Sequence, residues 1–178
     1  MEPFGHSSDV ILDPRRKKKW FDKKKRACYM IYPRSMVIFW GESEEYWSWE
    51  YFQETSGDYF EIAKLKQVCW FEIEGRLNTS ELSPKVDYEA VFVIKLSQWA
   101  HGWETPSRLK LTLPGGKVQQ RRVPLLEEPR GEWIEIRIGN FQIEKNESGG
   151  DIVGNLKTAS GYWKQGLTLK GFIIRPAT

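Results

Sequence analysis

Histidine and cysteine are scarce in this chain of 178 residues, which contains two of each. Neither His6 nor His101 lies at metal-ligand spacing from a cysteine or from the other histidine, so the sequence argues against a zinc site. Cys28 and Cys69 are too few for a disulfide framework and fit free thiols in a reducing compartment, although a single bridge between them stays open. We therefore expect neither a metal nor another cofactor.

Long apolar stretches are also missing. No segment reaches the length that crosses a bilayer, and the first residues lack the apolar core of a secretory signal. The chain has no G-x-S-x-G elbow, which would indicate a catalytic nucleophile, and no glycine-rich phosphate loop before a helix. We expect a protein without a membrane partner, in the cytoplasm, the nucleus or both.

Positive charge is concentrated near the N-terminus. The net charge is only +3, and the run RRKKKWFDKKKR at 15–26 leaves the remainder of the chain near neutral or slightly acidic. Such a run is typical of a nuclear localisation signal or a polyanion-binding patch, but also of an ordinary solvated charge run. We divide the chain into a basic, partly disordered N-terminal arm, 1–26, and one domain, 27–178. With 40% apolar residues, that domain can bury a core without disulfides.

Period-two patterning recurs along the domain and predicts strands with one apolar face. The clearest segments are VCWFEIEGRL at 68–77, DYEAVFVIKL at 87–96, RLKLTL at 108–113, WIEIRIGNF at 133–141 and LTLKGFIIRP at 167–176. Glycine-containing turns, among them ASGYWKQG at 159–166, separate them. DYFEIAKLKQV at 58–68 is the exception, a short helical turn or an irregular lead into a strand. The pattern predicts an all-β fold, an antiparallel β-sandwich of jelly-roll type.

One window, WGESEEYWSWEYF at 40–52, concentrates aromatic residues beside acids. Two of Glu42, Glu44 and Glu45 could form a glycosidase pair, which needs carboxyl groups about 5–9 Å apart across a cleft. Acids so close in sequence are more often a solvated loop, and nothing in the window supplies the burial that keeps one carboxyl protonated. We therefore expect a protein that is not an enzyme.

A stacking platform is the second interpretation of this window. Trp40 ends an apolar run, and the polar excursion after it returns to Tyr46 and Trp47, so the two tryptophans can stand on either side of one loop. Indole faces cover the C–H faces of a pyranose, while carboxylates accept its hydroxyl hydrogens. The competing interpretation is packing, in which Trp47 and Trp49 line one face of a strand on the core. Both fit the residues.

The chain resembles the phloem protein 2 family of plant lectins, also called Nictaba-like after the tobacco agglutinin. That family opens with a tryptophan, a short acidic or polar loop and a Y-W-x-W segment, which is WGESEEYWSW here, at 40–49. Further blocks follow in the family's order at 68–96, 131–141 and 162–176. Together they extend the resemblance over nearly all of 27–176.

The resemblance implies a β-sandwich that binds N-acetylglucosamine oligomers, as in chitooligosaccharides, and the chitobiose core of N-glycans on glycoproteins, without catalysis or metal. The family's two sugar-contacting tryptophans fall on Trp40 and Trp47, and its acidic position falls on Glu42. Tyr46 is expected to add its ring edge or hydroxyl. Weaker candidates for the carbohydrate-binding site are Trp49, Trp163 and Lys164. The resemblance also implies homodimers, and a location in cytoplasm, nucleus or phloem sap.

The N-terminal arm carries the alternative function, a nucleic-acid or protein carrier in phloem, with RNA as the partner. Some family members join ubiquitin ligases through an F-box, but the segment before residue 27 lacks the length and apolar pattern for one. A W-x-D-K segment like that of the family suggests that Trp20 and Phe21 dock on the sandwich while the lysines stay in water. We expect residues 1 to about 14 to be disordered.

Four further tryptophans have a structural interpretation. Trp99 and Trp103 either flank a second contact or close an end of the sandwich, and we favour the structural role. Trp70 and Trp133 are expected in the core or on a sheet face.

Overall fold

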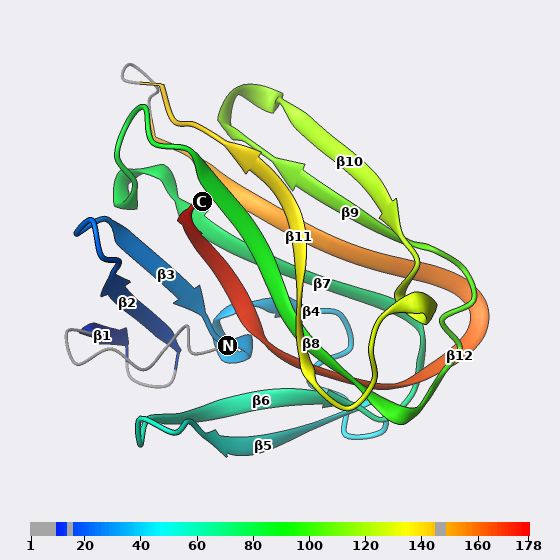
Figure 1. The fold of residues 1–178 in the computed structure, drawn as a ribbon. Helices are drawn as coiled ribbons and strands as arrows, with labels where there is room; N and C mark the ends of the chain where they lie inside the picture. The colour runs from blue at the N-terminus through cyan, green and yellow to red at the C-terminus, as the bar shows by residue number, and fades with distance from the viewer. Residues whose placement is uncertain (1–9, 14–15, 145–148) are drawn as a thin grey trace.

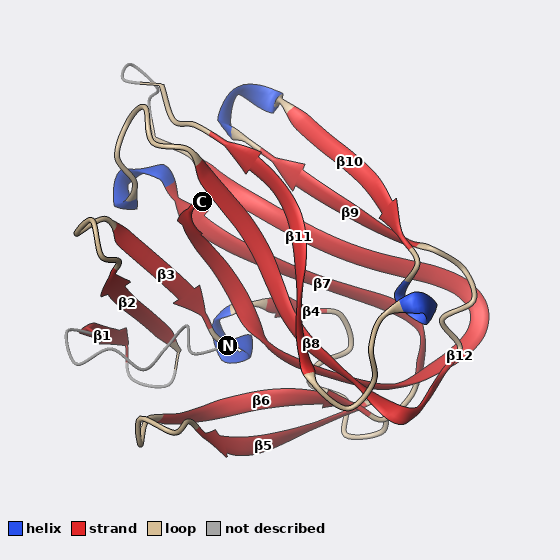
Figure 2. Ribbon diagram, in the orientation of Figure 1, coloured by secondary structure: helices blue, strands red, loops and turns tan. Residues whose placement is uncertain are grey.

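The computed structural model describes residues 10–13, 16–144 and 149–178. This part of the chain contains twelve β-strands and four single turns of 3-10 helix (Figure 2). The strands are β1 (Val10–Asp13), β2 (Lys17–Phe21), β3 (Ala27–Ile31), β4 (Val37–Ile38), β5 (Trp47–Gln53), β6 (Tyr59–Leu65), β7 (Val68–Asn78), β8 (Tyr88–His101), β9 (Ser107–Thr112), β10 (Val118–Val123), β11 (Trp133–Phe141) and β12 (Asp151–Pro176). The 3-10 turns are Pro33–Ser35, Thr79–Glu81, Pro114–Gly116 and Leu125–Glu127.

The strands form two antiparallel sheets that share β12. Its first part, 151–159, pairs with β7 and β9, while its second part, 167–176, pairs with β8 and, over shorter stretches, with β3 and β6. Figure 1 shows β12 bending between these two parts, from the orange segment to the red one. We call the first sheet, β10-β9-β12-β7-β4, the β9 sheet, and the second, with β1–β3, β5, β6, β8 and β11, the β8 sheet. The predicted β-sandwich of jelly-roll type is confirmed.

The main core lies between the two sheets. Most of the residues that period two assigns to inward faces are buried there: Phe71, Ile73, Leu77, Tyr88, Ala90, Phe92, Ile94, Leu96, Leu109, Leu111, Ile134, Ile136, Ile138, Leu167 and Leu169. Gly75 and Gly154 face each other across β7 and β12. A Cβ at Gly75 would lie 2.3 Å from Cγ of Phe172, and one at Gly154 would lie 2.5 Å from Cε1 of the same ring. The two glycines therefore make room for a phenylalanine from the opposite sheet.

A second apolar cluster explains where the strand predictions were wrong. The segment 58–68 contains a regular strand, β6, with neither a helical turn nor an irregular lead. Phe60 and Ile62 pack in the second cluster, whereas Ala63 and Leu65 face the main core. With both faces covered, β6 shows no clean alternation, and the period-two signal is lost.

Irregular register in β12 accounts for two further corrections. The predicted turn at 159–166 is not a boundary between strands, because 160–163 bulge out of β12 between Ala159, which pairs with Trp70, and Lys164, which pairs with Val68. A second register shift lies between Leu169 and Gly171 in the pairing with β8. Ile173 therefore faces the second cluster instead of sharing a face with Leu169.

The described part of the basic arm belongs to the β8 sheet, because β2 pairs with β3. Trp20 is buried, as predicted, whereas Phe21 is exposed. The expectation that the lysines stay in water is wrong for Lys18, which shares a face with Trp20 and is buried with its Nζ 3.0 Å from Oδ2 of Asp58. The predicted disorder of 1 to about 14 falls mostly outside the described residues, although 10–13 form β1. The domain boundary at residue 26 stays a prediction.

Candidate functional site

The loop between β4 and β5 presents Trp40 to solvent. Three backbone bonds fold the loop, from Gly41 N–H to Ile38, from Ser43 N–H to Trp40 and from Tyr46 N–H to Ser43. Trp40 itself has φ of 66°, in the left-handed region that a bulky residue rarely adopts, and its side chain is 58% exposed. A strained backbone that holds a tryptophan in water is typical of a functional position.

Trp47 lies beneath this loop and corrects the predicted site. Its side chain is only 2% exposed, its ring centroid lies 6.1 Å from that of Phe71, and its indole N–H donates to the Phe39 carbonyl oxygen at 3.2 Å. A ring with so little exposure has no face to offer a pyranose. The packing interpretation therefore holds for Trp47, which supports the loop from the core.

An open pocket of about 180 Å³ begins beside Trp40. Its lining residues come from the β4–β5 loop, the start of β7 and the bulge in β12: Trp40, Tyr46, Val68, Cys69, Trp70 and Trp163. We call it the aromatic pocket. Tyr46 stands between two tryptophans, with its ring centroid 6.0 Å from that of Trp40 at 74° and 6.4 Å from that of Trp163 at 30°. The structure thus brings together the predicted residues Trp40, Tyr46 and Trp163.

Trp163 reaches the pocket because the bulge at 160–163 is held from below by Lys164. The Lys164 side chain is buried, and its ammonium group donates to the carbonyl oxygens of Cys69, of Tyr162 at 2.9 Å and of Ser160 at 3.5 Å. Burial lowers the pKa of this ammonium group. With its donors committed to the backbone, Lys164 shapes the site without reaching a ligand.

Trp70 is the residue that sequence patterning missed. It was expected in the core or on a sheet face, and it lies on the exposed face of β7, where it lines the pocket with 44% of its side chain exposed. Its indole N–H donates to Oε1 of Glu72 at 2.9 Å, and the ammonium group of Lys157 lies 4.2 Å from its ring centroid. Trp70 therefore forms a wall of the pocket, with its hydrogen-bond donor already used.

Glu42 and Trp49 lie elsewhere. Both line a separate hollow of about 280 Å³ whose residues do not include Trp40. The indole N–H of Trp49 donates to the Gly41 carbonyl oxygen at 3.0 Å, and the Arg34 guanidinium carbon lies 3.7 Å from a Trp49 ring centroid. Trp49 is thus already stacked, and Glu42, which is exposed, does not join the aromatic pocket.

Other chemistry finds little support in the described residues. Glu42, Glu44 and Glu45 are all exposed. No group of three or more histidine, cysteine, aspartate or glutamate side chains in the described part of the chain could hold a metal ion. Both cysteines are free thiols. None of the helical turns in 10–13, 16–144 and 149–178 has the length and apolarity that a membrane crossing needs.

Among solved structures, the carbohydrate-binding module TmCBM61, determined in complex with β-1,4-galactotriose, is similar over 80% of this chain and 87% of its own, with 15% identity and a TM-score of 0.43.

Curated relatives are far more similar in sequence. Protein PHLOEM PROTEIN 2-LIKE A1 of Arabidopsis thaliana is 40% identical over 172 residues, which cover 95% of this chain and 70% of the relative. A lectin of Luffa acutangula is 39% identical over 171 residues, 96% of this chain and 81% of its own. The family model for phloem protein 2 matches residues 26–176. The chain therefore belongs to the phloem protein 2 family.

Proposed function

We propose that the protein is a carbohydrate-binding lectin whose sugar site is the aromatic pocket. The observation that carries this proposal is the gathering of three solvent-exposed indoles, those of Trp40, Trp70 and Trp163, around one open pocket with Tyr46 between two of them. Large exposed aromatic rings are costly in water unless they meet a ligand, and a pyranose offers the C–H faces that suit them. Relatives named lectin support the same function.

We further propose N-acetylglucosamine oligomers and the N-glycan core as ligands. Trp40 and Trp163, exposed by 58% and 51%, stack on pyranose faces, and the Tyr46 hydroxyl exchanges a hydrogen bond with a ring hydroxyl. Val68 gives the pocket an apolar floor, on which the methyl group of an acetamido substituent can rest. Glycoproteins that carry such sugars are then the partners, in cytoplasm, nucleus or phloem sap.

Binding occurs without chemistry on the sugar. A shallow site that competes with water for every hydroxyl holds each sugar weakly, so a homodimer that presents two such pockets would gain affinity on clustered glycans. In this proposal the exposed rings of the aromatic pocket contact the sugar, while Trp47 and Lys164 hold the backbone that carries those rings.

Calorimetric titration of the full chain with chitotriose tests the proposal. Trp40→Ala and Trp163→Ala should each weaken binding by about tenfold or more, because each removes one stacking face. Trp99→Ala is the matched control, since Trp99 is 85% exposed but does not line the pocket. If all three variants bind chitotriose as the unchanged protein does, the site assignment is wrong.

The alternative of a nucleic-acid carrier that uses the basic arm gains no support from the described residues. Lys18 is buried against Asp58, and the ammonium group of Lys17 lies 3.2 Å from a carboxylate oxygen of Glu81. Arg26 also pairs with Asp22, at 2.9 Å, so three of the cations in the run are already neutralised within the fold. RNA binding stays a proposal, to be tested by the salt dependence of affinity.

A further inference from the structure

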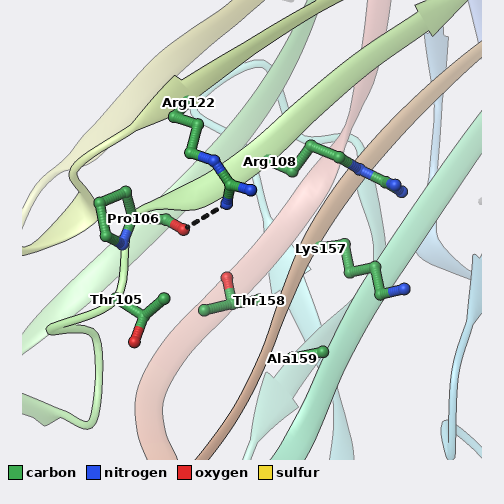
Figure 3. A pocket seen from close by; sticks show the side chains of 7 residues that line it. All are labelled: Thr105, Pro106, Arg108, Arg122, Lys157, Thr158 and Ala159. Atoms are coloured by element: carbon green, nitrogen blue, oxygen red, sulfur yellow. Dashed lines mark hydrogen bonds between the residues drawn. The ribbon is translucent and has the colours of Figure 1, made fainter.

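A second pocket, of about 240 Å³, lies on the β9 sheet and is lined by three cations. Arg122 of β10 pairs in register with Arg108 of β9, and Arg108 pairs with Lys157 of β12, so the three stand in one row across adjacent strands. Figure 3 labels all three among the residues that line the pocket, with the Arg122 guanidinium directed at Pro106 and the Arg108 and Lys157 side chains extending together away from Arg122. We call it the basic pocket. Like charges directly opposite one another destabilise a sheet, so such a row calls for a counter-charge.

The described residues around the row do not supply this negative charge. None of the three cations forms an ion pair within the described residues, whereas Arg175 in the other sheet pairs with both Glu89 and Glu135. The acid nearest in register is Glu72, which pairs with Lys157 across β7 and β12.

Glu72 is committed to other donors. Its Oε1 accepts from the Trp70 indole N–H and its Oε2 accepts from Nδ2 of Asn155, each at 2.9 Å. The Lys157 ammonium group lies over the Trp70 ring instead. The row therefore carries three positive charges, none of which forms an ion pair with Glu72 among the described residues.

The arginines also keep unused donor capacity. Arg108 donates from Nη2 to Oδ1 of Asn155 at 3.1 Å, while its Nε–H is buried without a hydrogen-bond partner. Arg122 makes a long bond of 3.4 Å to the Pro106 carbonyl oxygen, drawn as the dashed line in Figure 3. Buried donors in folded proteins nearly always have hydrogen-bond partners, so an unpartnered donor marks a place where a ligand could supply the missing acceptor.

We propose that the basic pocket binds a phosphate group, either as inorganic phosphate or as a phosphate monoester. A phosphate carries a charge of about −1.5 to −2 at pH 7, which matches three unneutralised cations better than the single charge of a carboxylate does. Guanidinium groups present planar forks of donors that suit phosphate oxygens, and lysine adds a point charge. In this proposal the Lys157 side chain turns from the Trp70 ring toward Arg122, so that both contact the phosphate, with Arg108 between them in register. The proposal does not rest on sugar binding, although Lys157 also contacts Trp70, which lines the aromatic pocket.

Arginine side-chain NMR spectra of the full, ¹⁵N-labelled chain test this directly. Inorganic phosphate is titrated at constant ionic strength, with chloride as the reference anion, and the Nε–H signals of Arg108 and Arg122 are followed. We expect both signals to shift and to saturate with phosphate but not with chloride. Arg122→Gln and Lys157→Gln should each weaken phosphate binding about tenfold, because each removes one charged contact.

Arg121→Gln is the matched control. Arg121 neighbours Arg122 in β10 and carries the same charge, but its guanidinium donates to the Arg137 carbonyl oxygen and does not line the pocket. Glucose 6-phosphate in a parallel titration separates the two sources, since tighter binding of the ester points to a phosphate carried on a larger molecule and tighter binding of inorganic phosphate points to the free ion. Shifts that fail to saturate, or equal phosphate affinity in the Arg122→Gln and Arg121→Gln variants, would overturn the proposal.

Discussion

The indole N–H of Trp47 donates to the backbone carbonyl oxygen of Phe39, at 3.2 Å, and so ties the core to the loop that carries Trp40. Two tryptophans seven positions apart therefore have different tasks. Trp40 stands in water at the mouth of the aromatic pocket, and Trp47 holds the backbone next to it. A loss of sugar binding would follow from changing either residue, but for different reasons.

Unfolding in urea separates the two roles. Trp47→Ala should lower the free energy of unfolding by about 3–5 kcal/mol, because it opens a cavity in the core beside Phe71. Trp40→Ala should change it by less than about 1 kcal/mol, because the lost side chain is mostly in water. Equal stability of the two variants would show that Trp47 is not a core residue.

The glycine pair behind Phe172 gives a prediction on packing. Gly75→Ala should cost about 1–3 kcal/mol of unfolding free energy, because the new methyl group would overlap the Phe172 ring. Gly149→Ala serves as control, since nothing lies within 4 Å of a Cβ built there. A Gly75→Ala protein as stable as the control would mean that Phe172 can move aside at little cost.

The two thiols differ in burial, and Cys28 should make stability depend on alkaline pH. Burial, with the negative charge of Asp22 as a further cause, raises the pKa of the Cys28 thiol from 9.0 to about 12. The folded protein then keeps a proton that the unfolded chain loses above about pH 9. The stabilising contribution is therefore complete below pH 9 and is lost as pH rises towards 12, by up to about 1.4 kcal/mol per pH unit.

Urea unfolding between pH 8 and pH 11 checks this. Cys28→Ala should flatten the decline in the free energy of unfolding relative to the unchanged protein, and Cys69→Ala is the matched variant that removes the other thiol. Comparing slopes isolates the thiol from Tyr29, whose pKa burial also raises, and from Lys164, whose pKa burial lowers. Identical slopes in the two variants would show that Cys28 titrates normally in the fold.

Glycosidase activity should be absent against chitooligosaccharides at any pH. Glu42 is exposed and does not line the aromatic pocket, so it is not placed to protonate the glycosidic oxygen of a sugar bound there. Mass spectrometry of a long incubation with chitohexaose checks this. Products that form with the unchanged protein but not with a Glu42→Gln variant would show catalysis.

Local sequence signals predicted the strands and part of the site, and non-local packing explains what they missed. Trp40 and Tyr46 lie in one short window, where the aromatic motif and the loop between them are visible. Trp70 and Trp163 are more than 90 positions apart, and they meet only because the bulge in β12 lies opposite the start of β7. No local pattern reports such a register shift.

The same limit applies to Trp47 and Lys18. Period two says which residues share a face, but not whether that face is covered. Trp47 is the first residue of β5, an edge strand that pairs with β6, and this position turns its side chain toward the core. Lys18 is buried because Asp58, in the connection between β5 and β6, supplies a carboxylate 40 positions away. From the sequence alone, a run of lysines is therefore predicted to be solvated, because the distant carboxylate that pairs with one of them is not visible.

Alkylation of Cys69 tests the central claim, that sugar binds in the aromatic pocket. Cys69 lines that pocket, whereas Cys28 is buried in a different cluster and acts as an internal reference. With iodoacetamide at pH 8 and mass spectrometry as readout, chitotriose at a concentration that saturates binding should slow the labelling of Cys69 several-fold, and in Trp40→Ala the same protection should require a chitotriose concentration about tenfold higher or more. Labelling of Cys69 at the same rate with and without bound chitotriose would contradict the account and place the sugar elsewhere on the protein.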